Sequence, residues 1–291
     1  MPENKESPEL NQSRPEEDAG EGFTLLDKTQ SDFDLTIRDD QFDFYWLQDA
    51  VRLNRKKGKR FRLIDSGALE TQQLEWLAEA GADIYTSNSI KRKISELEII
   101  QMSCRKGNSI LVYLLKTSFG ENGEENGQEK GEEKEGNSLL LLNLARNGVY
   151  FHVPLRKTEE FPNLINLARE CRRGGSWLVY YHQGSFQQEL FALAGEGAWI
   201  HFSPDSIKER EEDFPYLDLV KLTQKKGANT VFYIDEKPSL SFLYDIMEAG
   251  AAVFFFRASF DFKSPFRPLQ EKARERELDF RAYYLYPNFI Y

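Results

Sequence analysis

The sequence predicts an α/β protein with a TIM-like barrel, (βα)8, built from two four-unit half-barrel repeats. Three observations support this. From Phe61 onward, short apolar runs rich in β-branched and aromatic residues alternate with amphipathic stretches. Most of these stretches end in glycine just before the next apolar run. The two halves of the region also resemble each other in order and spacing.

Eight apolar runs predict the strands of the barrel. They cover residues 61–65, 82–87, 110–115, 149–153, 177–182, 198–203, 230–235 and 252–257. Their nearly continuous apolar character is typical of strands that are buried on both faces. Because each strand is followed by a helical stretch rather than a tight hairpin, the pairing should be parallel.

Seven stretches between these strands repeat leucine and isoleucine at three- and four-residue spacing, which predicts helices. Glycine can adopt the left-handed conformation that ends a helix, so glycines are expected just past the helix ends. They are Gly81, Gly107, Gly148, Gly174 or Gly175, Gly197, Gly227 and Gly250. Ser185, Ser206 and Ser239 are expected at helix starts, because serine readily caps a helix N-terminus.

An internal repeat supports the half-barrel interpretation. Gly67 and Gly184 lie 117 residues apart, and Ser-Ile-Lys at 89–91 recurs at 206–208 with the same offset. Duplication of a four-unit block would explain this spacing. The alternative is that all βα units resemble one another because they obey the same packing rules. Two five-stranded doubly wound domains are a further alternative for the fold.

The flanking segments suggest a domain plan. Residues 1–22 and 120–136 each carry seven acidic and two basic residues, and both are expected to be disordered and acidic. Residues 23–59 read as an N-terminal βα extension, and residues 60–291 as the barrel with the acidic insertion. Since ten units would overfill an ordinary barrel, the extension is expected to be a lid or a bottom-closing element. The last strand, 280–286, is expected to pack on the outside.

Charge and composition narrow the function classes. The two acidic segments account for the whole formal charge of −10, so the remaining chain is neutral and a nucleic-acid partner is unlikely. No apolar run reaches the roughly 18 residues that crossing a bilayer requires, so no membrane association is expected. Two cysteines, Cys104 and Cys171, are too few for a disulfide framework and fit a cytoplasmic location.

Candidate functional residues gather at the predicted C-terminal strand ends, where barrels place their active groups. We expect catalytic acid/base roles for His182, His201, Asp235 and Asp65. Substrate contacts are expected from Arg257, Tyr85 and Ser185. Ser185 precedes a helix whose N–H groups could take an anion, although a plain helix cap explains it as well.

A divalent metal is the one cofactor that the pattern suggests. His152, His182, His201 and Asp235 supply ligand types that such ions prefer. The alternative is that each histidine caps its strand by bonding to backbone. Which alternative holds depends on the face of the strand to which each histidine points. A shift of one residue moves a side chain from the barrel interior to the helix layer.

The sequence therefore indicates an enzyme that acts on a small polar or anionic metabolite through a His/Asp site. The alternative is a non-catalytic barrel used as a binding or protein-interaction module. The expected partner is a small-molecule ligand or another protein. The apolar C-terminal segment, 280–291, could also support a homo-oligomer.

Overall fold

The structure is a computed structural model that places a single ten-stranded parallel sheet along the chain. It describes residues 24–30, 34–116, 132–154, 158–208, 214–235, 239–256, 267–277 and 280–283. Strand order in the sheet follows chain order from β1 to β10, and every neighbouring pair is parallel.

Strands and helices alternate over the whole of this sheet. The strands are β1 (Leu35–Arg38), β2 (Phe61–Ile64), β3 (Ala82–Ser87), β4 (Leu111–Leu114), β5 (Tyr150–Pro154), β6 (Leu178–His182), β7 (Trp199–Phe202), β8 (Thr230–Ile234), β9 (Ala252–Phe256) and β10 (Phe280–Tyr283). The α-helices are α2 (Phe44–Lys56), α3 (Thr71–Ala80), α4 (Ile94–Gly107), α5 (Glu132–Arg146), α6 (Phe161–Gly174), α7 (Glu189–Gly195), α8 (Pro204–Lys208), α9 (Phe214–Lys225), α10 (Leu240–Glu248) and α11 (Arg267–Glu275). Two 3-10 helices, η1 (Asn88–Ile90) and η2 (Thr158–Glu160), precede α4 and α6.

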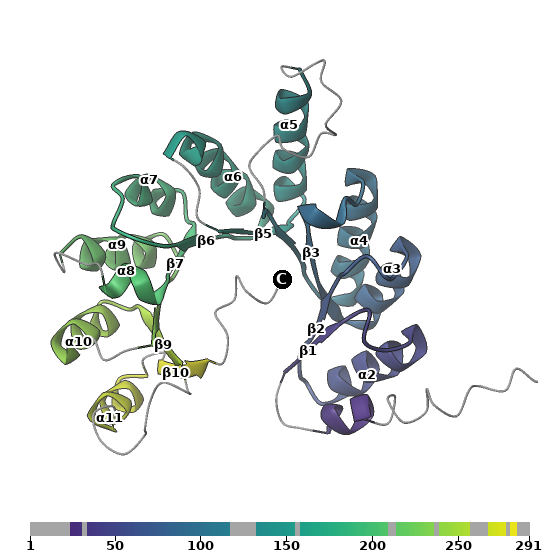
Figure 1. The fold of residues 1–291 in the computed structure, drawn as a ribbon, viewed down its shortest axis with the longest axis horizontal. Helices are drawn as coiled ribbons and strands as arrows, with labels where there is room; N and C mark the ends of the chain where they lie inside the picture. The colour runs from purple at the N-terminus through teal and green to yellow at the C-terminus, as the bar shows by residue number, and fades with distance from the viewer. Residues whose placement is uncertain are drawn as a thin grey trace, which may run out of the picture.

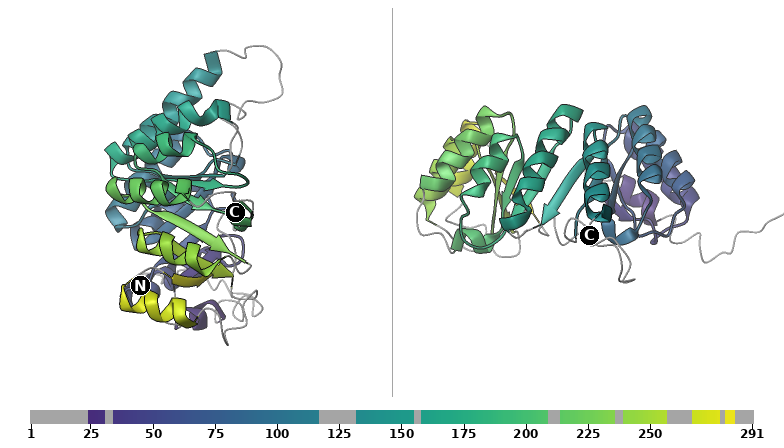
Figure 2. Two further views of the ribbon diagram at one scale, coloured as in Figure 1. Left: turned by 90° about the vertical axis from the view of Figure 1, so that its left-hand side faces the viewer. Right: turned by 90° about the horizontal axis from the view of Figure 1, so that it is seen from above.

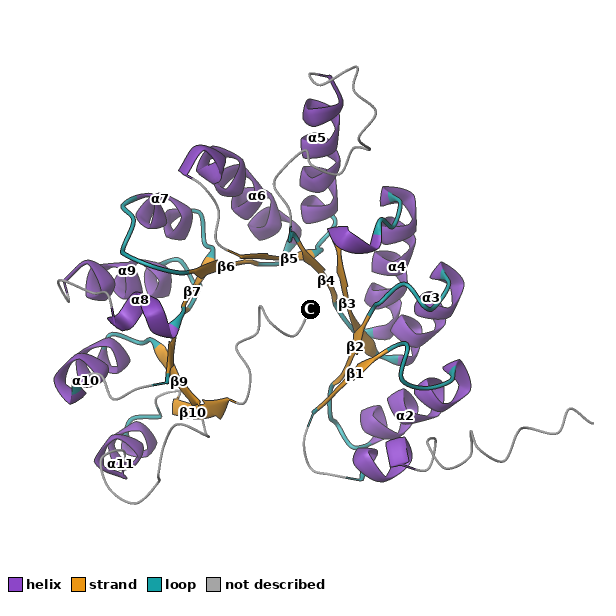
Figure 3. Ribbon diagram, viewed as in Figure 1, coloured by secondary structure: helices purple, strands orange, loops and turns teal. Residues whose placement is uncertain are grey.

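This arrangement is an α/β TIM-like barrel, as the sequence predicts. The sheet curves strongly and its helices all lie on the convex outer side (Figures 1 and 3). Viewed from above, the helices form one layer around the sheet (Figure 2). Two doubly wound domains are excluded, because that fold needs a reversal of strand order and helices on both faces.

The number of strands differs from the expected eight. Residues 23–59 are not a lid or a bottom-closing element, because β1 pairs with β2 in the sheet and α2 covers it with buried Leu47, Ala50 and Val51. Residues 280–283 do not pack on the outside either, because they form β10, which pairs with β9, whereas residues 284–286 lie outside the described residues. Within the described residues, β1 and β10 each have one neighbouring strand. Pairing satisfies backbone groups that a lid would leave exposed.

Strand register sorts the side chains between two apolar layers. One set, represented by Leu63, Ile84 and Tyr180, packs against the helices in the main core. The neighbouring residues point to the inner face, where Tyr181 and Tyr233 belong to a second, smaller cluster. Both kinds of position are apolar because the strands are buried on both sides.

Most of the expected helix ends are confirmed. Gly81, Gly148, Gly175, Gly197, Gly227 and Gly250 all have positive φ. Gly107 is the exception, because it is still helical and Asn108 takes the left-handed conformation with φ of 52°. Its lack of a side chain serves packing instead, since a Cβ there would lie 1.9 Å from the carbonyl oxygen of Ala78 in α3.

The expected serine caps are confirmed in one case of three. Ser239 accepts a hydrogen bond from the backbone N–H of Phe242 at the start of α10. Ser206 lies within α8, and α7 begins at Glu189 after Gln188 rather than at Ser185. The position of a serine in the sequence is therefore not enough to predict where a helix starts, because the path of the preceding loop also sets the first helical residue.

Residues 132–136, which were expected to belong to the disordered acidic insertion, are helical, because α5 begins at Glu132. Residues 1–22 and 120–131 lie outside the described residues. None of the described helices combines the length and the apolar character that spanning a membrane requires. The half-barrel duplication stays a prediction, in which β2 to β5 correspond to β6 to β9.

Replacing Gly107 by alanine should push α4 away from α3. The new methyl group would overlap the Ala78 carbonyl, so the free energy of unfolding should fall by about 3 kcal/mol in urea titrations. Gly195 is the matched control, because it also ends a helix but has open space around it. Gly195→Ala should leave stability unchanged or raise it by about 0.5–1 kcal/mol. Equal effects of the two changes would contradict this packing.

Candidate functional site

A buried ion pair lies at the C-terminal ends of β2 and β3. Asp65 directly follows β2, and Arg92 lies in the segment between η1 and α4. The Arg92 Nε and Nη2 atoms donate to the two Asp65 carboxylate oxygens at 2.6 and 2.7 Å. The two side chains are only 9% and 0% exposed. Such two-pronged contacts fix the plane of the guanidinium as well as its position.

The Asp65 carboxylate has two further donors. The Thr86 hydroxyl at the end of β3 donates to Oδ2 at 2.7 Å, and the Gly67 N–H donates to Oδ1 at 2.9 Å. Gly67 has φ of +89°, which lets the loop turn back over the carboxylate. The bond to Asp65 raises the pKa of Arg92, so the guanidinium stays charged.

A second carboxylate, from β1, holds the same loop. Asp39 Oδ1 accepts bonds from the Ser66 N–H at 2.9 Å and from the Ser66 hydroxyl at 2.5 Å. Asp39 Oδ2 accepts from the Leu69 N–H at 3.3 Å. The loop over residues 66–69 is therefore held from two adjacent strands, which is possible only because β1 is part of the sheet.

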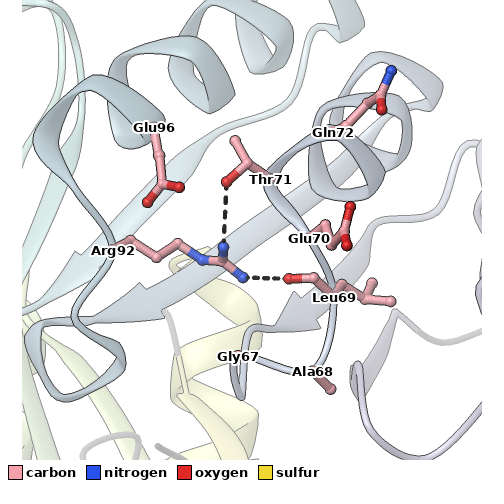
Figure 4. A pocket seen from close by; sticks show the side chains of 8 residues that line it. All are labelled: Gly67, Ala68, Leu69, Glu70, Thr71, Gln72, Arg92 and Glu96. Carbon is pink, nitrogen blue, oxygen red and sulfur yellow. Dashed lines mark hydrogen bonds between the residues drawn. The ribbon is translucent and has the colours of Figure 1, made fainter.

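This loop, the start of α3, Arg92 and Glu96 line an open pocket of about 460 Å³. Figure 4 shows the Arg92 guanidinium directed to the Leu69 carbonyl oxygen, at 2.8 Å, and to the Thr71 hydroxyl, at 3.5 Å. The lining residues are Gly67, Ala68, Leu69, Glu70, Thr71, Gln72, Arg92 and Glu96. The pocket therefore offers polar groups of both kinds, with an arginine at one side and two carboxylates beside it.

Two of the three histidines lie on the inner face of the sheet. The Tyr181 hydroxyl bonds to His152 Nδ1 at 3.0 Å, and the Tyr233 hydroxyl bonds to His201 Nδ1 at 3.2 Å. The rings of Tyr181 and His201 pack edge to face with centroids 5.0 Å apart. Burial lowers the pKa of His152 to about 4 and that of His201 to about 3. Both imidazoles are therefore neutral near pH 7.

His182 lies on the other face, in the helix layer. Its ring packs against Phe202 with centroids 5.4 Å apart, and its Nε2–H donates to the Ser185 carbonyl oxygen at 2.8 Å. Its position differs by one residue from that of Tyr181, which points inward. The expected convergence of three imidazoles is therefore wrong, because neighbouring residues of a strand face opposite sides. Among the described residues, no three His, Cys, Asp or Glu side chains form a group that could hold a metal ion.

The other predicted site residues are dispersed. Tyr85 shares the inner face with His152, its ring centroid 6.3 Å away, and burial raises the pKa of its hydroxyl. Asp235 follows β8 and is partly buried. Ser185 is exposed and contributes its carbonyl rather than its hydroxyl to His182. Arg257 lies outside the described residues.

Of the predicted residues that the structure describes, Asp65 alone belongs to the Arg92 site. Sequence reasoning missed Arg92, Asp39, Thr86 and Glu96. The sequence does contain a signal for Arg92. Arg92 lies in the loop after β3, and β3 pairs with β2, the strand that Asp65 follows. Loops at one edge of a parallel sheet meet, so an acid and a base there can pair. Asp39 was not identified because residues 23–59 were interpreted as an N-terminal extension outside the barrel.

Comparison with known proteins gives no family for this chain. No family model matches the sequence, and no curated protein matches it. Among solved structures, a candidate fructose-1,6-biphosphate aldolase from Coccidioides immitis has 14% identity and a TM-score of 0.32, with 79% of this chain and 88% of that chain covered. The catalytic domain of beta-amylase from Paenibacillus polymyxa has 9% identity and a TM-score of 0.28, covering 84% and 89% of the two chains. These values say nothing about the activity of this chain.

Removing one partner of the Asp65–Arg92 pair should be costly. Asp65→Ala leaves a guanidinium buried without its carboxylate, so the free energy of unfolding should fall by about 3–5 kcal/mol in urea titrations. The double variant Asp65→Leu with Arg92→Met should lose less than Asp65→Ala, because no charge stays buried. Glu79→Ala breaks an exposed pair with Lys106 and is the control, with little change expected. A double variant that loses as much stability as Asp65→Ala, or more, would contradict the pairing.

Acidification should destabilise the protein through the inner-face imidazoles. Their pKa values of about 4 and about 3 in the folded chain lie below the unfolded value of about 6.5. The unfolded chain therefore takes up protons first, and stability is lost as the pH falls below about 6.5, by about 1.4 kcal/mol per pH unit for each ring. Urea titrations at pH 7 and pH 5 measure this loss.

The variants His152→Gln and His201→Gln should each lose less stability between these two pH values than the original chain does. Asp218→Asn, at an exposed position on α9, is the control and should keep the original loss. An unchanged loss in both histidine variants would show that these rings are not the groups that titrate.

Proposed function

We propose that this chain is a βα-barrel protein that binds a small polar molecule in the Arg92 pocket. One observation carries the proposal: a charged guanidinium is held rigidly by Asp65 at the wall of a pocket of about 460 Å³. This volume lies in the usual range of small-molecule sites. The pocket is also at the sheet edge where barrels bind their ligands.

A purely structural role explains the ion pair less well. Burying two charges stabilises a fold little, and apolar residues of similar size often do as well. The position that corresponds to Asp65 in the proposed repeat is His182, a neutral ring packed on Phe202. The same turn is therefore built there without a charge, since Gly184, like Gly67, has positive φ. A bound ligand would explain why the turn after β2 carries the charged Asp65–Arg92 pair.

We place binding ahead of histidine catalysis in this proposal. General acid/base groups work best when their pKa lies near the working pH. The lowered pKa values of His152 and His201 leave both rings uncharged, and both are already bonded to tyrosines. The roles in catalysis and metal binding expected for the histidines and Asp235 have no comparable support from geometry.

A screen of polar metabolites by ligand-observed NMR tests the proposal. Compounds that bind the full chain should lose at least about tenfold in affinity in Arg92→Lys, because lysine cannot reproduce the planar fork that Asp65 holds. Thr71→Val removes one lining hydroxyl at nearly constant volume and should also weaken binding, by about threefold to tenfold. Lys106→Ala, which alters an exposed residue near the C-terminal end of α4, is the control.

Two results of the ligand screen would contradict the proposal. The proposal fails if no polar compound binds, or if every binder keeps its affinity in both pocket variants. Thr71→Val keeps the test valid if Arg92→Lys proves unstable, because Thr71 makes only the long contact to Arg92.

A further inference from the structure

We infer that the ligand of the Arg92 pocket is a saturated, hydroxyl-rich molecule that carries a protonated amine, such as an amino sugar. This inference rests on the proposed function and adds the chemical class of the ligand. It follows from the charges around the pocket, from the hydrogen-bonding atoms that face it, and from the kind of side chains that line it.

The charge balance of the pocket is negative. The positive charge of Arg92 is already met by Asp65 through two bonds. Glu70 and Glu96 also line the pocket, and neither forms an ion pair within the part of the chain that the structure describes. An anionic ligand would meet both carboxylates there, although Glu96 also interacts electrostatically with Arg92, whereas a cation would be attracted by them.

Both carboxylates keep acceptor capacity for such a cation. Glu96 Oε2 accepts the Lys93 N–H at 2.8 Å, and the N–H of Gln73 at the start of α3 donates to the backbone carbonyl oxygen of Glu70 at 3.1 Å. An ionised carboxylate offers about four acceptor positions, so each has several left. An ammonium group has three donors and no acceptor, which matches a pair of carboxylates.

The opposite side of the pocket supplies donors for oxygen atoms. Arg92 uses Nε and Nη2 for Asp65 and Leu69, but among the described residues Nη1 makes only the long 3.5 Å contact to the Thr71 hydroxyl. Figure 4 shows this side of the guanidinium beside Thr71. A ligand hydroxyl could bond to both groups, because it can accept from Nη1 and either donate to or accept from the threonine.

The lining disfavours a flat aromatic ligand. Its residues include no aromatic side chain on which a ring could stack, and the apolar ones are the small Ala68 and the largely buried Leu69. Aromatic ligands gain much of their affinity from such stacking. A saturated molecule that bonds through hydroxyl and amino groups suits these walls better.

Three sugars of similar size and different charge test the inference: glucosamine, glucose and gluconate. Titrations of the isotope-labelled full chain by NMR at about pH 6, where the amine of glucosamine and the carboxylate of gluconate are charged, report both affinity and location. Glucosamine should perturb the amides of Gly67, Thr71 and Arg92 and should bind at least tenfold more tightly than glucose. Gluconate should bind the weakest of the three.

Glu96→Gln should remove most of this preference. The change keeps the size and an acceptor oxygen but loses the charge, so glucosamine should weaken about tenfold while glucose changes little. Glu79→Gln is the matched control, because Glu79 is an exposed glutamate on α3 that does not line the pocket.

Each outcome bears on one claim. If glucose or gluconate binds as tightly as glucosamine, or if Glu96→Gln leaves the preference intact, the inference is wrong and the proposed function stands. If none of the three sugars perturbs the pocket, the inference is wrong as well. The screen of polar metabolites then decides the proposed function independently.

Discussion

Parallel pairing in chain order is the constraint on which the rest of this structure depends. It aligns the C-terminal ends of all ten strands at one edge, so loops that are distant in sequence meet there. It also alternates side chains strictly between the helix layer and the inner face. For this reason Asp39, Asp65 and Thr86, which come from three successive strands, lie together. Asp39 and Asp65 hold one loop, and the Thr86 hydroxyl donates to Asp65.

The edge formed in this way is chemically uneven. At β2 and β3 it carries a buried ion pair, several carboxylates and a pocket. At β6 and β7 the comparable place is filled by rings, with His182 against Phe202 and Phe186 against Tyr216. Neutral rings are easily buried, whereas charges need bonded partners. The charges at the polar end are therefore met by bonded partners, and the rings at the aromatic end are held by packing.

The inner face shows how burial changes the chemistry that a residue type suggests. A histidine at a strand end suggests metal binding or proton transfer when it is seen only in sequence. Here His152 and His201 are enclosed by tyrosines, and burial lowers the pKa of both rings. They are neutral hydrogen-bonding groups in an aromatic layer, which connects β5, β6, β7 and β8 by side-chain contacts across the sheet.

The sequence by itself determined the α/β class, the parallel strands between residues 61 and 256 and most of the glycine helix ends, because these follow from local periodicity and from the backbone freedom of glycine. It also placed Asp65 at the C-terminal end of its strand, directly after β2. The tertiary structure alone decided that β1 and β10 join the sheet, that His182 faces away from His152 and His201, and that Arg92 reaches Asp65. Those outcomes depend on sheet register and on loops that meet in space, and short-range sequence patterns record neither.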